Sequence, residues 1–231
     1  MISSEVPFHD PVDLLICGST LPACELAAKV SRSGLKVLLA MERTNPYPEA
    51  VGSLRSWYDR SILDQKNLPE VVAALLARKQ NWEIAGSRLY FNPATAIDLI
   101  EAQLEESGVH FFYNLAPALA LGNRDHCSGV VVGGKTGLFG IQANVVVDAT
   151  LSGTVGKLFG CPTAATKSPC AIHLCVELKS PRPPRQLETN LRDFHCRMEV
   201  HHRYAEFRLT PSKEMNFKRN ELMAHATAAL L

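Results

Sequence analysis

Apolar and polar positions near the start of the chain predict a strand, a helix and a second strand. Val12–Ile16 is apolar except at Asp13, so the stretch is apolar enough for a strand buried on both faces, and Gly18 follows where the chain needs a tight turn. A helix then begins near Pro22, carries apolar residues with helical spacing, and ends at Gly34, which suits a left-handed cap. Val37–Met41 is again apolar and predicts a second buried strand. The pattern indicates two parallel strands joined by a crossover helix.

This alternation is interrupted and then resumes. Residues 44–90 do not follow the pattern, and within them Pro69–Lys79 predicts a short helix that has its proline in the first turn. Asn92 suits the N-cap of a longer amphipathic helix, and Gly108 suits its end. Val109–Tyr113 then predicts the third parallel strand. Residues 44–90 are therefore an insertion into an otherwise regular α/β pattern.

Short strands separated by glycine-rich turns come next. Ala116–Leu121, Ser128–Val132 and Gly137–Gln142 predict a small antiparallel meander, and Asn144–Ala149 predicts one more buried strand that closes the main sheet. We therefore expect an α/β fold with a mostly parallel sheet, in which a β-meander crosses over between the third strand and the last.

The composition shifts beyond residue 160. Cys170–Leu178 alternates as a strand, a proline-rich stretch after it predicts a stiff linker or an edge, and alternation returns from Val200 onward. Asn220–Leu231 predicts an amphipathic helix. About 70 residues are marginal for a complete domain, so 161–231 is expected to be the start of a second, α+β domain.

Composition and charge exclude several classes of protein. The 231 residues are 46% hydrophobic and 20% charged, as in an ordinary globular chain, and a net charge of +1 gives no electrostatic reason to expect nucleic acid or an acidic membrane surface as a partner. No apolar run reaches the length of a membrane span and no export signal is visible, so we expect a cytoplasmic protein. Seven cysteines without framework spacing favour reduced thiols.

The turn after the first strand carries a degenerate dinucleotide-binding pattern. Against Gly-x-Gly-x-x-Gly/Ala, Gly18 fits the first position and Ala23 the third, whereas Thr20 replaces the second glycine. A helix N-terminus at this place can bind a pyrophosphate, and Glu42, 24 residues after Gly18, is placed to accept ribose hydroxyls. The β-branched side chain of Thr20 should crowd the pyrophosphate or displace the loop.

A second motif lies at the end of the last strand, where Asp148-Ala149-Thr150 precedes a glycine-containing turn. With the first motif, it resembles the FAD-dependent oxidoreductases of the two-dinucleotide-binding-domain type, over residues 12–43 and 93–160. The resemblance implies FAD as the cofactor. It departs from the family at Leu151, where a glycine is usual, and in the glycine pair that faces the flavin, for which only Gly52 can answer.

The resemblance also implies a set of site residues. The loop and first helical turn would cradle the pyrophosphate, an acid at the end of the second strand or its neighbour would bind the adenosine ribose, and the later strand end would lie near the cofactor. The expected cofactor-binding residues are Gly18, Ser19, Thr20, Leu21, Pro22, Ala23, Glu42, Arg43, Asp148, Ala149 and Thr150.

The domain boundaries follow from the resemblance. Residues 1–160 would form a Rossmann-like FAD-binding domain with the insertion at 44–90, and residues 161–231 would form part of a substrate-type domain. The leading interpretation is an FAD-dependent oxidoreductase, or its N-terminal part, acting on a small molecule that the sequence does not identify. The alternative is a non-catalytic Rossmann-like module, with an interaction or structural role, that has lost tight dinucleotide binding. An NAD-dependent dehydrogenase is less favoured because no catalytic Tyr-Lys or His constellation accompanies the strand end.

Other candidate groups are weighed against simpler roles. Cys170, His173 and Cys175 have metal-like spacing, but on a strand Cys170 points to the opposite face, so we expect no metal. The neighbouring side chains of His195-Cys196 and of His201-His202 diverge on an alternating segment, so these histidines are expected to be solvated or packed.

Four aromatic residues lie in or beside the insertion: Trp57, Tyr58, Trp82 and Tyr90. They are suited either to walling a ligand pocket or to packing the insertion onto the sheet, and packing is the preferred interpretation.

The last expectation concerns turnover. The family completes its flavin domain with a later segment that carries a second Gly-Asp motif, and none is present between Gly160 and Leu231. We therefore expect the 231-residue chain not to turn over a substrate alone, and to associate with itself or with a second chain that completes the fold.

Overall fold

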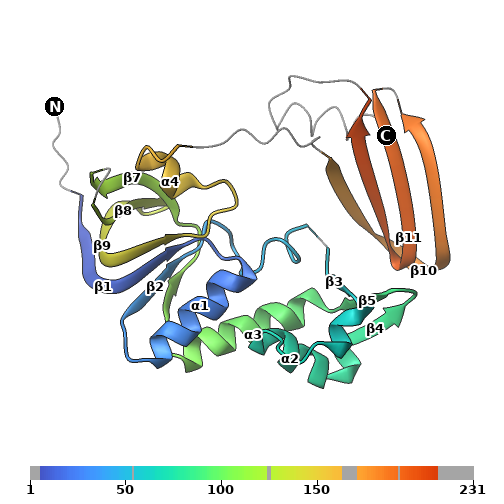
Figure 1. Cartoon of the computed structure of the whole chain (residues 1–231), viewed down its shortest axis with the longest axis horizontal. Coiled ribbons are helices and arrows are strands. Elements are labelled where there is room, and N and C mark those ends of the chain that lie inside the picture. The colour runs from blue at the N-terminus through green and yellow to red at the C-terminus, as the bar shows by residue number, and fades with distance from the viewer. Residues whose placement is uncertain (1–5, 54, 124–125, 163–170, 192, 213–231) are drawn as a thin grey trace.

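The structure is a computed structural model that describes residues 6–53, 55–123, 126–162, 171–191 and 193–212. Figure 1 shows a helix-covered sheet of six strands, a small three-stranded sheet beside it, and a long two-stranded ribbon that the later part of the chain forms. The six-stranded sheet carries both predicted motifs, so its topology decides where they lie.

Three parallel strands form one half of the main sheet. β1 (Phe8–Cys17) pairs with β2 (Val37–Ala40), and β2 pairs with β6 (His110–Phe112). The register sets Leu15 beside Leu38, and both side chains are fully buried. Buried strands of a parallel sheet read as continuous apolar runs, so the first strand, helix, strand unit is confirmed.

Two helices cover one face of this sheet. α1 (Leu21–Arg32) and α3 (Pro93–Glu106) pack with alternate residues of β1 and β2 in one apolar cluster. The side-chain oxygen of Asn92 accepts hydrogen bonds from the N–H groups of Ala94 and Thr95, at 2.9 and 3.4 Å, so the predicted N-cap is confirmed. Among the described residues, no helix has the length and apolar character needed to cross a membrane.

The other half of the sheet consists of β9, β8 and β7. β7 (Ala116–Gly122), β8 (Cys127–Gly134) and β9 (Gly137–Asp148) are antiparallel neighbours, as the meander predicts. The expected break between Gly137–Gln142 and Asn144–Ala149 is wrong, because both segments belong to the single strand β9.

The reason for this difference lies in the two edges of β9. One edge of its first half pairs with β8, with Val130 opposite Ile141, whereas the other edge pairs in parallel with β1 as far as Cys17 and Asp148. The strand therefore changes partners without a turn. Buried residues of β8 and β9, with Val155 of α4 (Thr154–Leu158), cover the second face of the sheet.

The insertion is more structured than its sequence pattern indicates. The predicted helix is confirmed as α2 (Glu70–Ala77), and it ends early because Arg78 leaves helical geometry, with φ −100° and ψ 76°. The insertion also contains a three-stranded antiparallel sheet, which was not predicted. The remaining elements are β3 (Trp57–Asp59), η1 (Arg60–Asp64), η2 (Lys79–Asn81), β4 (Trp82–Ala85) and β5 (Arg88–Phe91).

The late part of the chain forms an antiparallel ribbon of β10 (Ile172–Leu191) and β11 (Phe194–Pro211). The strand predicted to end at Leu178 continues through the proline-rich stretch, which is therefore an edge and not a linker. The pairing shifts register between Glu177 and Arg182 and again before Arg185, because prolines cannot donate to the ladder. Cys170 and the predicted helix Asn220–Leu231 lie outside the described residues.

Candidate functional site

The order of strands places both sequence motifs at a topological switch point. β1 lies between β2, which follows it in the chain, and β9, which comes last, so the connections leave β1 in opposite directions. Ligands of open α/β sheets bind in the crevice at the carboxyl ends of such strands. Cys17 and Asp148 are neighbours in the register at this end, and α1 begins directly after it.

Seven of the eleven predicted residues line one small cleft at this crevice: Gly18, Ser19, Thr20, Glu42, Arg43, Ala149 and Thr150. The other four lie next to it, with Leu21, Pro22 and Ala23 in the first turn of α1 and Asp148 at the end of β9. The structure thus brings together segments that are more than 100 residues apart in the sequence. Gly52 is not among the residues that line the cleft.

Gly18 allows the two strand ends to approach each other closely. Its φ is +121°, and a Cβ atom added there would lie 2.2 Å from the carbonyl oxygen of Ala149. The N–H of Gly18 donates to Ala40, and the N–H of Ala149 donates to Cys17, each at 2.8 Å. Any other residue at position 18 would push the first motif away from the second.

Asp148 shapes the second motif without lining the cleft. Its carboxylate accepts hydrogen bonds from the N–H and hydroxyl groups of Thr150, at 3.0 and 2.6 Å, and from the N–H of Gly156 at 2.8 Å. The Thr150 hydroxyl in turn accepts from the N–H of Thr154 at 2.7 Å. These bonds form an Asx-type turn that holds Ala149 and Thr150 beside Gly18.

Two acids flank the buried end of β1. Glu42, at the end of β2, is half-buried, and Asp148 lies across the strand. Burial and, to a smaller extent, the negative charges of Asp148 and Glu42 together raise the pKa of the Cys17 thiol to about 12. Cys17 is therefore an unreactive core residue, and Glu42 remains the acid placed to meet a ligand in the cleft.

The N-terminus of α1 already holds an anion from the protein itself. The N–H of Leu21 donates to Glu49 Oε1 at 2.8 Å, whereas Thr20, the N-cap residue, makes no side-chain cap. Burial raises the pKa of the Glu49 carboxyl, and Glu49 Oε2 is buried without a hydrogen-bond partner among the described residues. A carboxylate thus takes the place at which helix N-termini bind phosphate.

The turn that carries Glu49 is anchored on both sides. The N–H of Tyr47 donates to the carbonyl of Ser19 at 2.7 Å, and the Tyr47 hydroxyl lies 2.9 Å from that of Tyr58. With this turn in place, the cleft measures about 10 Å³, close to the room that one water molecule needs. The N–H of Leu21 is open to a ligand anion only if the Glu49 turn moves.

A larger cavity, about 430 Å³, lies at the opposite end of the main sheet. Gly34, Val37 and Gly108 line it at the amino ends of the strands, so none of the predicted site residues contributes to it. It therefore serves as a control site in tests of where the cofactor binds.

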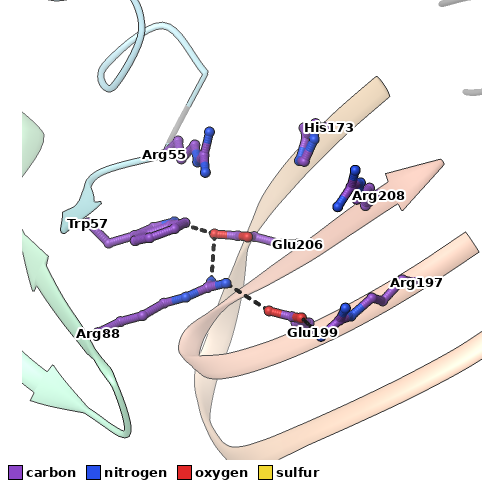
Figure 2. A pocket seen from close by; sticks show the side chains of 8 residues that line it. All are labelled: Arg55, Trp57, Arg88, His173, Arg197, Glu199, Glu206 and Arg208. Atoms are coloured by element: carbon purple, nitrogen blue, oxygen red, sulfur yellow. Dashed lines mark hydrogen bonds and ion pairs between the residues drawn. The ribbon is translucent and has the colours of Figure 1, made fainter. Parts of the chain in front are cut away.

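A different pocket, about 150 Å³, lies between the small sheet and the ribbon (Figure 2). It is lined by Arg55, Trp57, Arg88, His173, Arg197, Glu199, Glu206 and Arg208. Sequence reasoning missed this pocket because its walls come from two segments, 55–88 and 173–208, that are far apart in the sequence and carry no motif. The signal that was available was Trp57, which lines the pocket, contrary to the preferred packing interpretation.

Of the other three aromatics, Tyr58 and Trp82 pack against the core cluster of the main sheet, as expected, whereas Tyr90 does not. Tyr58 stacks on Phe91 with ring centres 5.1 Å apart, and Trp82 donates its indole N–H to the carbonyl of Leu76 at 3.0 Å. Tyr90 stacks on Tyr204 of β11 at 5.5 Å, so it joins the small sheet to the ribbon.

The histidines and cysteines weighed in the sequence are spread over the ribbon. His195 lies 3.2 Å from Asn190 Oδ1, and His173 pairs across the ribbon with Arg208. Within the described ranges, no three His, Cys, Asp or Glu residues are grouped so that they could hold a metal ion. Cys170 and the side chains of His201 and His202 lie outside what the structure describes.

One comparison with known proteins identifies a family. The sequence matches the family described as FAD dependent oxidoreductase over residues 13–225. It matches no curated protein.

Three solved structures illustrate the likeness in fold. The anhydrotetracycline hydroxylase OxyS from Streptomyces rimosus is 14% identical, with a TM-score of 0.63 over 94% of this chain and 49% of that one. A geranylgeranyl bacteriochlorophyll reductase-like protein from Thermoplasma acidophilum is 12% identical, with a TM-score of 0.62 over 87% and 57%. The myxobacterial chondrochloren halogenase CndH is 14% identical, with a TM-score of 0.55 over 96% and 57%. The chain therefore spans about half the length of these proteins.

Proposed function

Because the chain belongs to the FAD dependent oxidoreductase family, we propose that it binds FAD in the crevice at the carboxyl ends of β1 and β9. FAD is the cofactor of the family, and the predicted fold class, an α/β FAD-binding domain with a mostly parallel sheet, is confirmed. When bound, FAD supplies the electron-transfer chemistry of an oxidoreductase, and the protein supplies binding and orientation. The non-catalytic alternative is not favoured.

The residues of the crevice have separate roles in this proposal. The N–H of Leu21 at the start of α1 would bind the pyrophosphate, and the carboxylate of Glu42 would accept the ribose hydroxyls. Arg43, which lines the cleft beside Glu42, would contribute positive charge near the phosphates. Ala149 and Thr150 would form the opposite wall.

The observation that carries the proposal is the close approach of Gly18 and Ala149. A Cβ atom added to Gly18, in the first motif, would lie 2.2 Å from the carbonyl oxygen of Ala149, in the second motif. The two motifs therefore meet at the carboxyl ends of the strands, where open parallel sheets bind nucleotides. Chance placement of both motifs would not require them to meet there.

Glu49 has a part in the same proposal, because it occupies the N–H of Leu21. Two anions cannot share one helix N-terminus, so FAD binding would release Glu49 and shift the turn that Tyr47 anchors. Moving this turn costs free energy, and the free energy of FAD binding would be less favourable by that amount.

The proposal is tested by titrating the purified chain with FAD and following flavin absorbance and fluorescence. We expect saturable uptake, which Glu42→Gln weakens by about tenfold because charge-assisted hydrogen bonds to the ribose are lost. Glu106→Gln, at the exposed end of α3, removes the same charge far from the crevice and should leave uptake unchanged. A colourless protein that takes up no added FAD would favour the non-catalytic module.

A further inference from the structure

The pocket between the small sheet and the ribbon concentrates positive charge (Figure 2). Its lining includes four arginines and two glutamates, which leaves a net charge of +2 when His173 is neutral. The arginines come from three separate parts of the chain, namely the segment before β3, β5 and β11. Such convergence needs a reason, because like charges brought together in a partly enclosed space repel one another.

Both glutamates form ion pairs with arginines in the part of the pocket that is lower in Figure 2. Arg88 donates to Glu199 at 2.7 Å and forms an ion pair with Glu206 at 3.0 Å, and these three side chains are only 14%, 20% and 15% exposed. Arg197 forms a second ion pair with Glu199 at 2.8 Å. The two negative charges of the pocket are therefore paired with Arg88 and Arg197.

The same ion pairs fix the position of Trp57. Its indole N–H donates to the carboxylate of Glu206, and the Arg88 guanidinium lies 3.9 Å from the centre of its ring. A cation held over an indole face is attracted by the ring. Trp57 is therefore a rigid, partly apolar wall that the ion-pair network holds in place.

The upper part of the pocket has cations without counter-charges. Figure 2 shows Arg55, His173 and Arg208 on the side away from the Arg88 ion pairs. Among the described residues, no carboxylate lies within ion-pair distance of Arg55 or Arg208, and these two side chains are exposed. Burial lowers the pKa of His173, and the positive charges of Arg55 and Arg208 lower it further, against a smaller opposite effect of Glu206.

We propose that Arg55, His173 and Arg208 form an anion subsite that takes the oxyanion end, a carboxylate or a phosphate, of a small-molecule ligand. Guanidinium groups present paired donors that match the oxygens of both oxyanions, and the ring of His173 adds one more donor. A cavity of about 150 Å³ is below the range of whole drug-sized ligands, so it holds one end of a ligand whose body lies outside the pocket.

This subsite is separate from the FAD crevice and does not depend on it. None of its three residues lines the cleft at Gly18, and the other residues that line their pocket belong to the small sheet and the ribbon. A test made without FAD therefore distinguishes failure of this inference from failure of the proposed cofactor site.

The test is a titration of the full chain, without FAD, followed by NMR of the histidine ring resonances. His173 is assigned by comparison with His173→Gln. Sodium benzoate and inorganic phosphate are the two probes, and chloride at equal ionic strength is the reference. We expect saturable shifts at His173 with one or both probes, and an increase in its pKa, because a bound anion offsets the two arginines. Response to benzoate alone indicates a carboxylate ligand, and response to phosphate alone indicates a phosphate ligand.

Matched variants separate specific binding from general charge screening. Arg208→Gln and Arg55→Gln should each weaken binding by about tenfold or more, because each removes charge-assisted hydrogen bonds. Arg185→Gln removes the same charge from an exposed position of the same ribbon, outside the pocket, and should leave binding unchanged. The inference is overturned if His173 responds to neither probe, or if Arg185→Gln weakens the response as much as Arg208→Gln does.

Discussion

The carboxylate of Glu49 accepts a hydrogen bond from the backbone N–H of Leu21 at 2.8 Å, in the first turn of α1. This N–H is one of the orphan donors that helix N-termini offer to phosphates. The chain therefore carries, 28 residues downstream, an anion of its own at this donor. In the proposed function, the affinity for FAD is the result of a competition between Glu49 and the pyrophosphate.

The first prediction concerns the charge of Glu49. Glu49→Gln should strengthen FAD binding by about tenfold, because a neutral amide competes less well for the helix N-terminus and no longer repels the pyrophosphate. Titration of flavin fluorescence measures the change, with Glu106→Gln as the control. Equal or weaker binding by Glu49→Gln would mean that Glu49 does not compete with the cofactor.

The second prediction concerns pH. Burial raises the folded-state pKa of Glu49 above its ordinary value of 4.5, so the folded chain binds the proton more tightly than the unfolded chain does. The contribution of Glu49 to the free energy of unfolding should therefore increase as pH falls from neutrality through the raised pKa, and level off below 4.5. Urea unfolding of the wild type and of Glu49→Gln over this range measures it. A stability difference that does not change with pH would show that the carboxyl is not perturbed.

The third prediction concerns Thr20. Its backbone is extended, with φ −62° and ψ 156°, and its hydroxyl does not cap the helix, so the threonine has no structural role that glycine would lose. Thr20→Gly should strengthen FAD binding by about tenfold, because the β-branched side chain no longer crowds the pyrophosphate, and should cost only a few tenths of a kcal/mol in stability. A loss of affinity would show that the Thr20 hydroxyl donates to the phosphate.

The fourth prediction concerns Gly18. Gly18→Ala should lower the free energy of unfolding by about 3 kcal/mol, because the new methyl group would meet the Ala149 carbonyl at 2.2 Å in a backbone conformation with φ +121°. Gly86→Ala is the matched control, since Gly86 also has a positive φ of +62° but has nothing within 4 Å of an added Cβ. Urea unfolding should show a clearly smaller loss for the control. Equal losses would assign the effect to backbone strain alone.

Much of the main sheet could be predicted because its signals are local. The turn at Gly18, the cap at Asn92 and the buried strands β1 and β2 each depend on residues that are close in the sequence, and the structure has all of them. The predicted burial of Asn144–Ala149 is wrong, because this end of β9 has no buried residue and Val145 is 55% exposed. The gathering of Gly18, Glu42 and Thr150 was also predictable, because the carboxyl ends of neighbouring parallel strands share one edge of the sheet.

The remaining features depend on contacts between distant segments. β9 passes Ala143 without a turn because its two edges meet different partners, and no local pattern encodes that. Glu49 lies in a loop without periodicity, so its bond to Leu21 becomes visible only when the turn is folded. The same reason hides the pairing of Arg88 with Glu199 and Glu206, 111 and 118 residues later in the chain.

The most direct test of the account is the response of assigned backbone amide resonances to FAD. We predict saturable shifts at Gly18, Leu21 and Ala149, with the largest at Leu21 as Glu49 is replaced, and no shifts at Gly34 and Gly108, which line the cavity at the opposite end of the sheet. Shifts centred on Gly34 and Gly108, or no shifts at FAD concentrations that saturate related flavoproteins, would contradict the placement of the cofactor at the β1 and β9 crevice.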